Sequence, residues 1–195
     1  MKTLFIECNM GAAGDMLMAA LSELIPAPEA FIERMNALGL PGVRFERRAA
    51  EKCGVTGTHI AVTVDGAEEL SHDVDGHDHE HHHDHDHHDE HEHDHDHEHH
   101  HHASALDIEA LIDRLDVSEK VRKDAKAVYG LIAEAESQVH GRPVSEIHFH
   151  EVGTWDAVAD VVGVCLLMEE IGAEKIVASP GHVGSGYVRC MHGVL

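Results

Sequence analysis

The sequence predicts a single α/β domain, of mixed α+β character, that is interrupted by a disordered loop rich in His, Asp and Glu. Three observations predict this class. Apolar runs typical of strands alternate with segments of helical periodicity. Apolar residues almost vanish between residues 71 and 103. The length of 195 residues suits one domain. We therefore expect residues 1–70 and 104–195 to form one domain, with the insertion at 71–103.

Before the loop, the pattern predicts a buried strand, a Gly-rich loop, two amphipathic helices and a hairpin. These elements occupy, in order, residues 2–8, 9–15, 15–25, 28–40 and 43–65. Pro26 and Pro28 end the first helix, and Gly39 closes the second. The turn CGVTG at 53–57 separates two strand-like runs, which indicates the hairpin.

After the loop, the pattern predicts three helices and two strands. The helices cover residues 104–115, 118–141 and 154–172, a strand runs into a tight turn at 144–153, and a short buried strand covers 175–180. Ser104 is a suitable N-cap for the first of these helices. The last residues, GHVGSGYVRCMHGVL, are rich in Gly and in polar side chains suited to a site.

The charge pattern argues against partners that are themselves negative. The formal net charge is −23, and residues 71–102 alone hold 12 Asp or Glu and no Lys or Arg. The other residues hold 25 acidic and 14 basic side chains, a formal charge of −11. Nucleic acids and anionic membranes both attract concentrated Lys and Arg. We therefore expect neither nucleic acid nor a membrane as a partner.

The cysteines and the apolar runs predict a cytoplasmic protein. Cys8, Cys53, Cys165 and Cys190 form no CxxC pair and show no disulfide-framework spacing. The N-terminal segment MKTLFIECNMGAAGD lacks the long apolar run of a signal peptide. The longest later run, VVGVCLLM, is too short to span a bilayer. Reduced thiols in the cytoplasm are therefore expected.

The loop itself is predicted to bind metal ions. Residues 72–102 contain 17 His and 12 Asp or Glu among 31 residues, too few apolar residues to offset the entropy of ordering. Neutral imidazole suits Ni, Zn, Cu and Co, and carboxylates add weaker oxygen ligands. Protons compete for the same imidazoles near neutral pH. A solubilising linker is the alternative interpretation. The candidate ligands are His77, His79, His81, His82, His83, His85, His87, His88, His91, His93, His95, His97, His99, His100, His101 and His102.

The first ordered motif is FIECNMGAAGDM. A strand leads to a turn that Gly11 and Gly14 permit, and Asp15 stands where the next helix begins. A helix start favours an anion such as phosphate, whereas Asp15 would cap the helix or hold a cation. The motif is neither a dinucleotide fingerprint nor a P-loop. A tight turn with an Asp cap and a binding site are both open interpretations.

The second motif is EIHFHEVGTWDAVAD. His148 and His150 are two residues apart, so in a strand they point to one face, with Glu151 on the other face or in the turn. Asp156 and Asp160 are four apart and share a face of a helix. Together these groups could hold a divalent metal or steer a substrate. Alternatively, Asp156 caps the helix and one His satisfies a backbone group.

The third motif is SPGHVGSGYVRCMHG. It places His182, Ser185, Cys190 and His192 among four glycines, and the Cys–His pair could bind a soft metal. A surface loop is the alternative. His59 and His140 stand alone, and we interpret both as ordinary surface or half-buried residues.

Three segments together resemble the LarC family, the nickel-insertion proteins of nickel-pincer cofactor biosynthesis. They are ECNMGAAGDMLMAAL, IHFHEVGTWDAVADVVG and HVGSGYVRCMHG, and a His-rich insertion lies between the first two, as in many members. The resemblance covers essentially the whole chain, and the HFHEVG segment with the two following Asp is its most specific part.

The resemblance implies a nickel insertase, a chelatase of the lyase class. Such a protein loads Ni(II) onto pyridinium-3,5-bisthiocarboxylic acid mononucleotide, so that two sulfurs and one carbon bind the metal. It consumes CTP, with Mg²⁺ or Mn²⁺, through a cytidylylated intermediate. The product serves lactate racemase and related nickel-pincer enzymes. The loop would gather nickel, and the ordered site would present it to the precursor.

The candidate site residues fall into three groups. We assign Asp15, Glu151, Asp156 and Asp160 as candidate catalytic residues, Gly11, Gly14, Ser185 and His192 as candidate cofactor-binding residues, and His148 and His150 as metal ligands beside those of the loop.

Two features depart from the family pattern. Members usually run about twice this length, and their CTP-binding region lies in the C-terminal part, so we expect Leu195 to precede it. In some members a frameshift separates the two parts, which makes a separately encoded C-terminal half a candidate partner. Glu7 stands where the family more often has Asp, which changes the reach by one methylene.

Two other functions are open at this stage. One is a nickel or zinc store or metallochaperone without catalysis, which predicts full metal capacity in the isolated loop. The other is a metal-dependent hydrolase, which rests only on His148, His150, Asp156 and Asp160.

Overall fold

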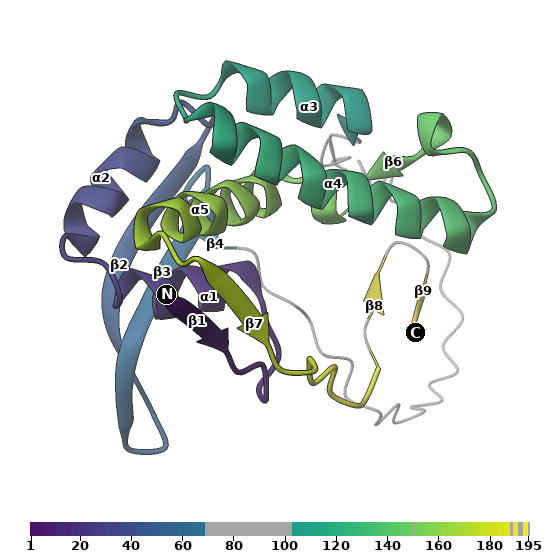
Figure 1. Cartoon of the computed structure of the whole chain (residues 1–195). Coiled ribbons are helices and arrows are strands. Elements are labelled where there is room, and N and C mark those ends of the chain that lie inside the picture. The colour runs from purple at the N-terminus through teal and green to yellow at the C-terminus, as the bar shows by residue number, and fades with distance from the viewer. Residues whose placement is uncertain (69–102, 150, 188, 191–192, 195) are drawn as a thin grey trace, which may run out of the picture. The chain divides into compact units, whose positions relative to one another are not determined.

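The computed structural model describes residues 1–68, 103–149, 151–187, 189–190 and 193–194. The chain divides into one unit of residues 1–70 and 101–184 and a second of residues 71–100 and 185–195. The first unit mixes helices and strands, which confirms the predicted fold class (Figure 1). The candidate ligands of the loop, together with His150 and His192, lie outside the described residues.

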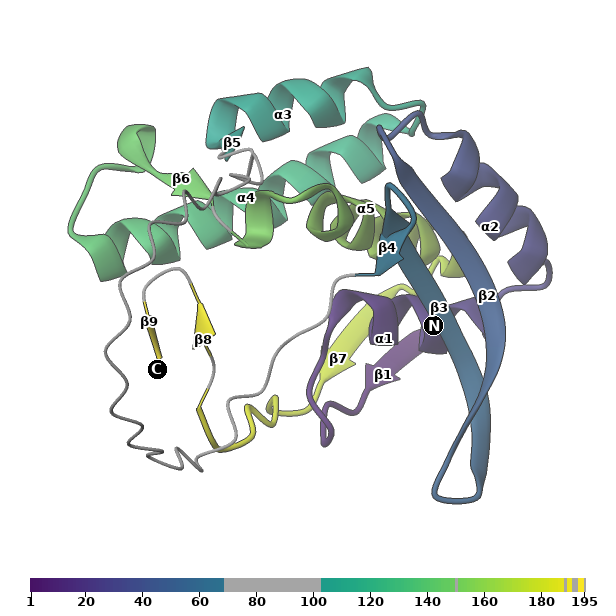
Figure 2. The same cartoon turned by 180° about the vertical axis from the view of Figure 1, so that it is seen from behind.

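Helix α5 (Trp155–Ile171) lies at the centre of the first unit. It packs against α1 (Gly14–Ser22), α4 (Glu119–His140) and the long hairpin (Figures 1 and 2). Its buried side chains are almost all apolar, and Val158, Val162 and Leu167 are fully enclosed. A helix that is apolar around most of its surface is typical of such a central position.

The hairpin matches its prediction closely. Strand β2 (Val43–Lys52) pairs antiparallel with β3 (Val55–Val64), and β4 (Ala67–Glu68) adds a short third strand. The turn is only Cys53 and Gly54, both with positive φ, so β3 begins earlier than the sequence predicts. Two left-handed residues match the twist of the flanking strands, which favours a two-residue turn.

Helix α2 (Pro28–Ala37) is held on the hairpin through one amide. The Asn36 side chain accepts a hydrogen bond from the Phe45 N–H at 2.9 Å and donates to the Phe45 carbonyl at 3.0 Å. These are the two bonds that a neighbouring strand would make, so Asn36 replaces a strand at this edge of β2.

Helices α3 (Ala105–Arg114) and α4 begin at serine caps. Ser104 accepts from the Asp107 N–H at 3.2 Å, and the Asp107 carboxylate accepts in return from the Ser104 N–H at 3.0 Å. This capping box confirms the predicted N-cap. Ser118 caps α4 in the same position, accepting from the Val121 N–H at 3.1 Å.

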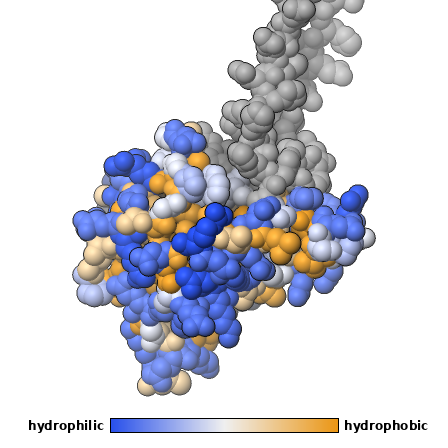
Figure 3. Space-filling model, turned by 90° about the horizontal axis from the view of Figure 1, so that it is seen from above, coloured by the Kyte–Doolittle hydropathy of each residue, from blue (hydrophilic) through white to orange (hydrophobic). Residues whose placement is uncertain are grey.

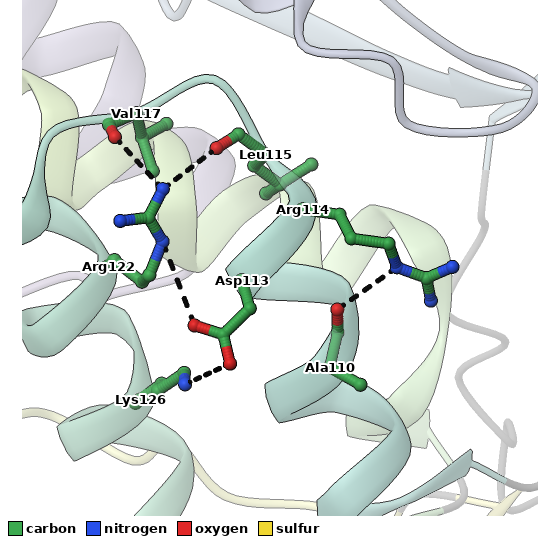
Figure 4. A network of polar contacts seen from close by, with 7 residues as sticks. All are labelled: Ala110, Asp113, Arg114, Leu115, Val117, Arg122 and Lys126. Carbon is green, nitrogen blue, oxygen red and sulfur yellow. Dashed lines mark hydrogen bonds and ion pairs between the residues drawn. The ribbon is translucent and has the colours of Figure 1, made fainter.

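A polar network fixes the turn between α3 and α4 (Figure 4). The Asp113 carboxylate contacts Lys126 at 2.6 Å and the Arg122 guanidinium at 3.7 Å. Arg122 also donates to the carbonyls of Leu115 and Val117 at 3.2 and 3.3 Å. One side chain of α4 therefore supplies hydrogen bonds to two backbone carbonyls that the end of α3 and the turn leave without a helical partner.

On the face seen from above, hydrophilic residues surround separate hydrophobic patches (Figure 3).

The segment predicted as a strand at 144–153 contains only two strand residues. β6 (His148–Phe149) lies between the 3₁₀ turns η1 (Val144–Glu146) and η2 (Glu151–Gly153). Its partner β5 (Ala103–Ser104) is equally short, because α3 starts directly after it. In the second unit, β8 (Arg189–Cys190) pairs with β9 (Gly193–Val194).

Both predicted strands are present, but the prediction that they are buried is wrong in this structure. β1 (Thr3–Ile6) pairs in parallel with β7 (Lys175–Ala178). All four residues of β7 are exposed, and in β1 only Leu4 is buried. The physical reason is that this sheet has two strands among the described residues, so little covers its apolar side chains.

Candidate functional site

Three aspartates meet where the first turns of α1 and α5 cross. Asp156 lies in the first turn of α5, and Asp160 follows one turn later. Asp15 lies in the first turn of α1. The charges of Asp15 and Asp156 both act on Asp160, so the three carboxylates form one electrostatic group, called here the acidic cluster.

Neither Asp15 nor Asp156 is a helix cap. The N-cap of α1 is Ala13, and the Asp15 carboxylate accepts instead from the Met16 N–H at 2.7 Å. The N-cap of α5 is Thr154. Both aspartates therefore lie inside the first turn, where the helix dipole favours negative charge. Neither aspartate therefore occupies the N-cap position that the alternative interpretation gave it.

Gly14 allows the two helices to come together at the acidic cluster. A Cβ atom placed on Gly14 would lie 2.6 Å from Cγ of Asp160, much closer than van der Waals contact. Gly163 has the same role further along α5, where a Cβ would overlap Sδ of Met18 on α1. Small residues at both points bring Asp160 within reach of the start of α1.

The Asp160 carboxyl is the most perturbed group of the cluster. Burial raises its pKa first, and the charges of Asp15 and Asp156 raise it further. A hydrogen bond from the Asp15 N–H lowers it by less, and the resulting pKa is about 7. Its Oδ1 is buried and has no hydrogen-bond partner within the described part of the chain. Asp160 can therefore take up or release a proton near neutral pH.

Tyr129 fixes the segment that precedes α5. Its hydroxyl donates to the Val152 carbonyl at 3.1 Å, and its ring lies 5.7 Å from that of Phe149 between centroids. Burial raises the pKa of Tyr129, and the charges of Asp156 and Asp160 add to the effect. The hydroxyl therefore stays protonated and serves as a hydrogen-bond donor that positions η2.

His148 stands at the point where the chain re-enters the fold after the loop. Ser104 is its partner in the β5–β6 ladder, and its side chain is exposed. Hydrogen bonds from Ser104 lower the pKa of Asp107, and the charge of His148 lowers it further. His148 and Asp107 therefore both lie beside Ser104, which follows the loop in the sequence. Glu151 begins η2, but its side chain lies outside what the structure describes.

The first and third sequence motifs meet at the end of β1. The Cys8 carbonyl accepts from the Gly11 N–H at 3.2 Å and from the His182 N–H at 3.0 Å. Cys8 itself donates its N–H to Oγ of Ser179 at 2.8 Å. Gly11 has φ of +89°, a conformation that favours glycine, so the predicted tight turn is present. Ser185 begins the second unit.

A groove of about 430 Å³ opens between α1 and the hairpin. Asp15 lines one end, and Lys52 and His59 line the hairpin side. The sequence interpretation missed Lys52 and treated His59 as ordinary. No local signal could have found them, because only the packing of a distant hairpin on α1 places them in the same groove as Asp15.

The described residues contain no preformed metal centre. Within these ranges no three His, Cys, Asp or Glu side chains are arranged to hold a metal ion. The predicted convergence of His148, His150, Asp156 and Asp160 is only partly visible, because His150 is outside the described ranges.

Replacing Gly14 with Ala is expected to destabilise the protein and disturb the acidic cluster. The new Cβ overlaps Asp160 close to the backbone of α5, where no rotamer change relieves it. We expect a loss of roughly 1–3 kcal/mol in the free energy of unfolding, measured by chemical denaturation. Gly130→Ala on α4 is the matched control: nothing lies within 4 Å of its Cβ, so it should be neutral or stabilising. Equal effects of the two changes would contradict this role of Gly14.

Comparison with known proteins identifies the class. A family model described as nickel insertion protein matches residues 4–195. The chain therefore belongs to the nickel insertion protein family, the LarC family that its motifs resemble. Proteins named pyridinium-3,5-bisthiocarboxylic acid mononucleotide nickel insertion protein are similar to it in Clostridium acetobutylicum (41% identity over 201 residues) and Lactiplantibacillus plantarum (37% over 196 residues).

The match covers nearly all of this chain but less than half of each of these relatives. All of this chain aligns with 47% of the C. acetobutylicum protein, and 99% of it aligns with 43% of the L. plantarum protein. The chain thus spans less than half the length of these relatives. No solved structure matches it. A search of the described helices finds none with the length and apolar character needed to cross a membrane.

Proposed function

We propose that this chain is the nickel-handling part of an insertase that loads Ni(II) onto pyridinium-3,5-bisthiocarboxylic acid mononucleotide. The observation that carries the proposal is the acidic cluster, in which a half-buried aspartate with one buried, unpartnered oxygen lies where α1 and α5 meet. Family membership supplies the metal and the substrate class.

The cluster fits the proton chemistry of this reaction. When nickel binds the ring carbon of the precursor, a Ni–C bond forms, the C–H bond breaks, and the proton must go to a base. We assign that base to the Asp160 carboxylate. Its pKa of about 7 suits a base that acts near neutral pH. Asp15 and Asp156 keep that pKa high through their charges.

The groove beside Asp15 is a suitable place for the mononucleotide. Its volume of about 430 Å³ is in the range of small-molecule sites. The Lys52 ammonium offers a positive charge for a phosphate, and the groove leads to Asp15. The His-rich loop would collect nickel, and His148 and His150 would receive it where the chain re-enters the fold.

The remaining steps belong to the whole family protein. We place CTP binding, with Mg²⁺ or Mn²⁺, on the C-terminal part of the family protein, for which a separately encoded half is one candidate source. The product would go to nickel-pincer enzymes such as lactate racemase. The free thiols of Cys8, Cys53 and Cys165 fit a cytoplasmic location for this chemistry.

A loading assay tests the proposal. The chain, Ni(II), CTP and the dithio precursor are mixed with and without a C-terminal family partner, and the nickel–sulfur absorption band is followed. Loading with the partner supports the proposal. Absence of loading in both mixtures, with several Ni(II) still bound per chain, would favour a metal store or metallochaperone. His148→Ala and Asp156→Ala then separate the two functions, since only an insertase loses loading while these variants stay folded.

A further inference from the structure

The β1–β7 sheet exposes side chains that parallel sheets normally bury. Phe5 is 60% exposed, Ile176 51% and Val177 36%. Parallel sheets are usually covered on both faces, which is why their strands are so apolar. Two strands alone make a marginal sheet. The sequence of both strands therefore fits a larger sheet than the described residues form.

The outer edge of β1 offers backbone groups to another strand. The carbonyls of Lys2 and Ile6 accept hydrogen bonds from the N–H groups of Lys175 and Ser179. Because backbone groups of successive strand residues point to opposite edges, Thr3 and Phe5 direct theirs away from β7. In the described part of the chain, β1 pairs with no strand but β7.

An apolar groove follows this outer edge. A cavity of about 210 Å³ lies between β1 and α1, with Phe5, Met16, Ala20 and Leu24 among its lining residues. Met16 and Ala20 are four residues apart on one side of α1, and Leu24 lies in the turn just after the helix ends, so the three line the cavity as a stripe that begins on α1. Met16 is 44% exposed and Leu24 58%. An added strand would cover this stripe, as sheets and helices pack in α/β proteins.

The length of the relatives indicates where that strand comes from. This whole chain aligns with 44% of the Clostridium kluyveri relative and 47% of the C. acetobutylicum relative. More than half of each relative therefore has no counterpart here. We propose that an apolar strand from that remaining part adds to the outer edge of β1 and packs on the α1 stripe.

This proposal rests on the proposed partnership with a C-terminal part, but it concerns binding alone. The test therefore contains no nickel, CTP or precursor, so its failure is distinct from a failure of loading. The chain is co-expressed with the remaining part of the C. acetobutylicum protein and purified through a tag on that part. Backbone hydrogen exchange of residues 2–8 is then compared between the chain alone and the complex.

Co-purification with slowed exchange of the Phe5 amide is the expected result. Ala20→Glu and Leu24→Glu should each lower the bound fraction about tenfold or more, since a charge would enter an apolar contact. Both residues are exposed in the chain alone, so these variants keep its fold. Leu131→Glu on α4, 68% exposed, is the matched control and should bind normally.

Three outcomes would overturn the proposal. One is no co-purification of the folded chain. Another is a complex in which the Phe5 amide exchanges as fast as before, because the partner then docks elsewhere. The third is protection of Phe5 that rises with the concentration of the chain alone, which would make a second copy the occupant.

Discussion

Asp160→Asn is expected to stop nickel loading while making the protein more stable at alkaline pH. Asn keeps an acceptor for the Asp15 N–H but cannot take a proton from the precursor. We expect the loading rate to fall about 10²-fold or more, the range for loss of a general base. The rate is measured from the nickel–sulfur absorption band with the C-terminal partner present.

The stability effect has a defined sign. The pKa of Asp160 is about 7 in the fold against 3.8 as its reference value. Because the fold disfavours the charged form, wild-type stability falls as pH rises from about 4 to about 7. The neutral Asn escapes this loss, so its advantage should grow over that interval and then level off at roughly 2–4 kcal/mol. Urea unfolding at several pH values measures it.

A surface aspartate serves as the control for Asp160→Asn. Asp116 is exposed, so Asp116→Asn should change neither loading nor the pH dependence of stability. An Asp160→Asn protein that loads at the wild-type rate would remove Asp160 from the chemistry. A gain in stability that is equal at all pH values would contradict the raised pKa.

Deleting residues 72–102 is expected to slow loading at low nickel and to spare it at high nickel. A tethered set of imidazoles raises the effective nickel concentration near the ordered site, and free nickel in excess makes that gain unnecessary. We expect about a tenfold or larger loss of rate at low micromolar nickel. Initial loading rates over a nickel titration measure this difference.

A loop of equal length made of Gly and Ser is the matched control for the deletion. If histidine content is what matters, this variant should behave like the deletion. Loss of loading at every nickel concentration would contradict a collecting role, since the loop would then be needed for the reaction itself. Full metal capacity in the isolated loop, without any effect on loading, would favour the storage function.

Local signals predicted most of the fold. The cap at Ser104 and the bounds of β2 follow from patterns within a few neighbouring residues. Asp156 and Asp160 could be placed on one helix because their spacing is local. What the sequence could not reveal depends on distant segments: the contact of Gly14 with Asp160, and the packing of the hairpin that puts Lys52 and His59 in the groove that Asp15 also lines.

The burial predicted for β1 and β7 was wrong for a different reason. Their apolar sequences predicted burial, and nothing in the two strands is unusual for a covered sheet. Burial is a property of the whole assembly, whereas this chain matches less than half of its relatives' length. The sequence interpretation and the structure would agree if the remaining part of the family protein covers the sheet.

The methionines of α1 differ sharply in their exposure to oxidants. Met18 is fully buried against Gly163, whereas Met16 is 44% exposed in the apolar groove. Peroxide should therefore convert Met16 to its sulfoxide long before Met18, and the sulfoxide is polar. An oxidised preparation would keep its core yet carry a polar group on the surface that faces β1.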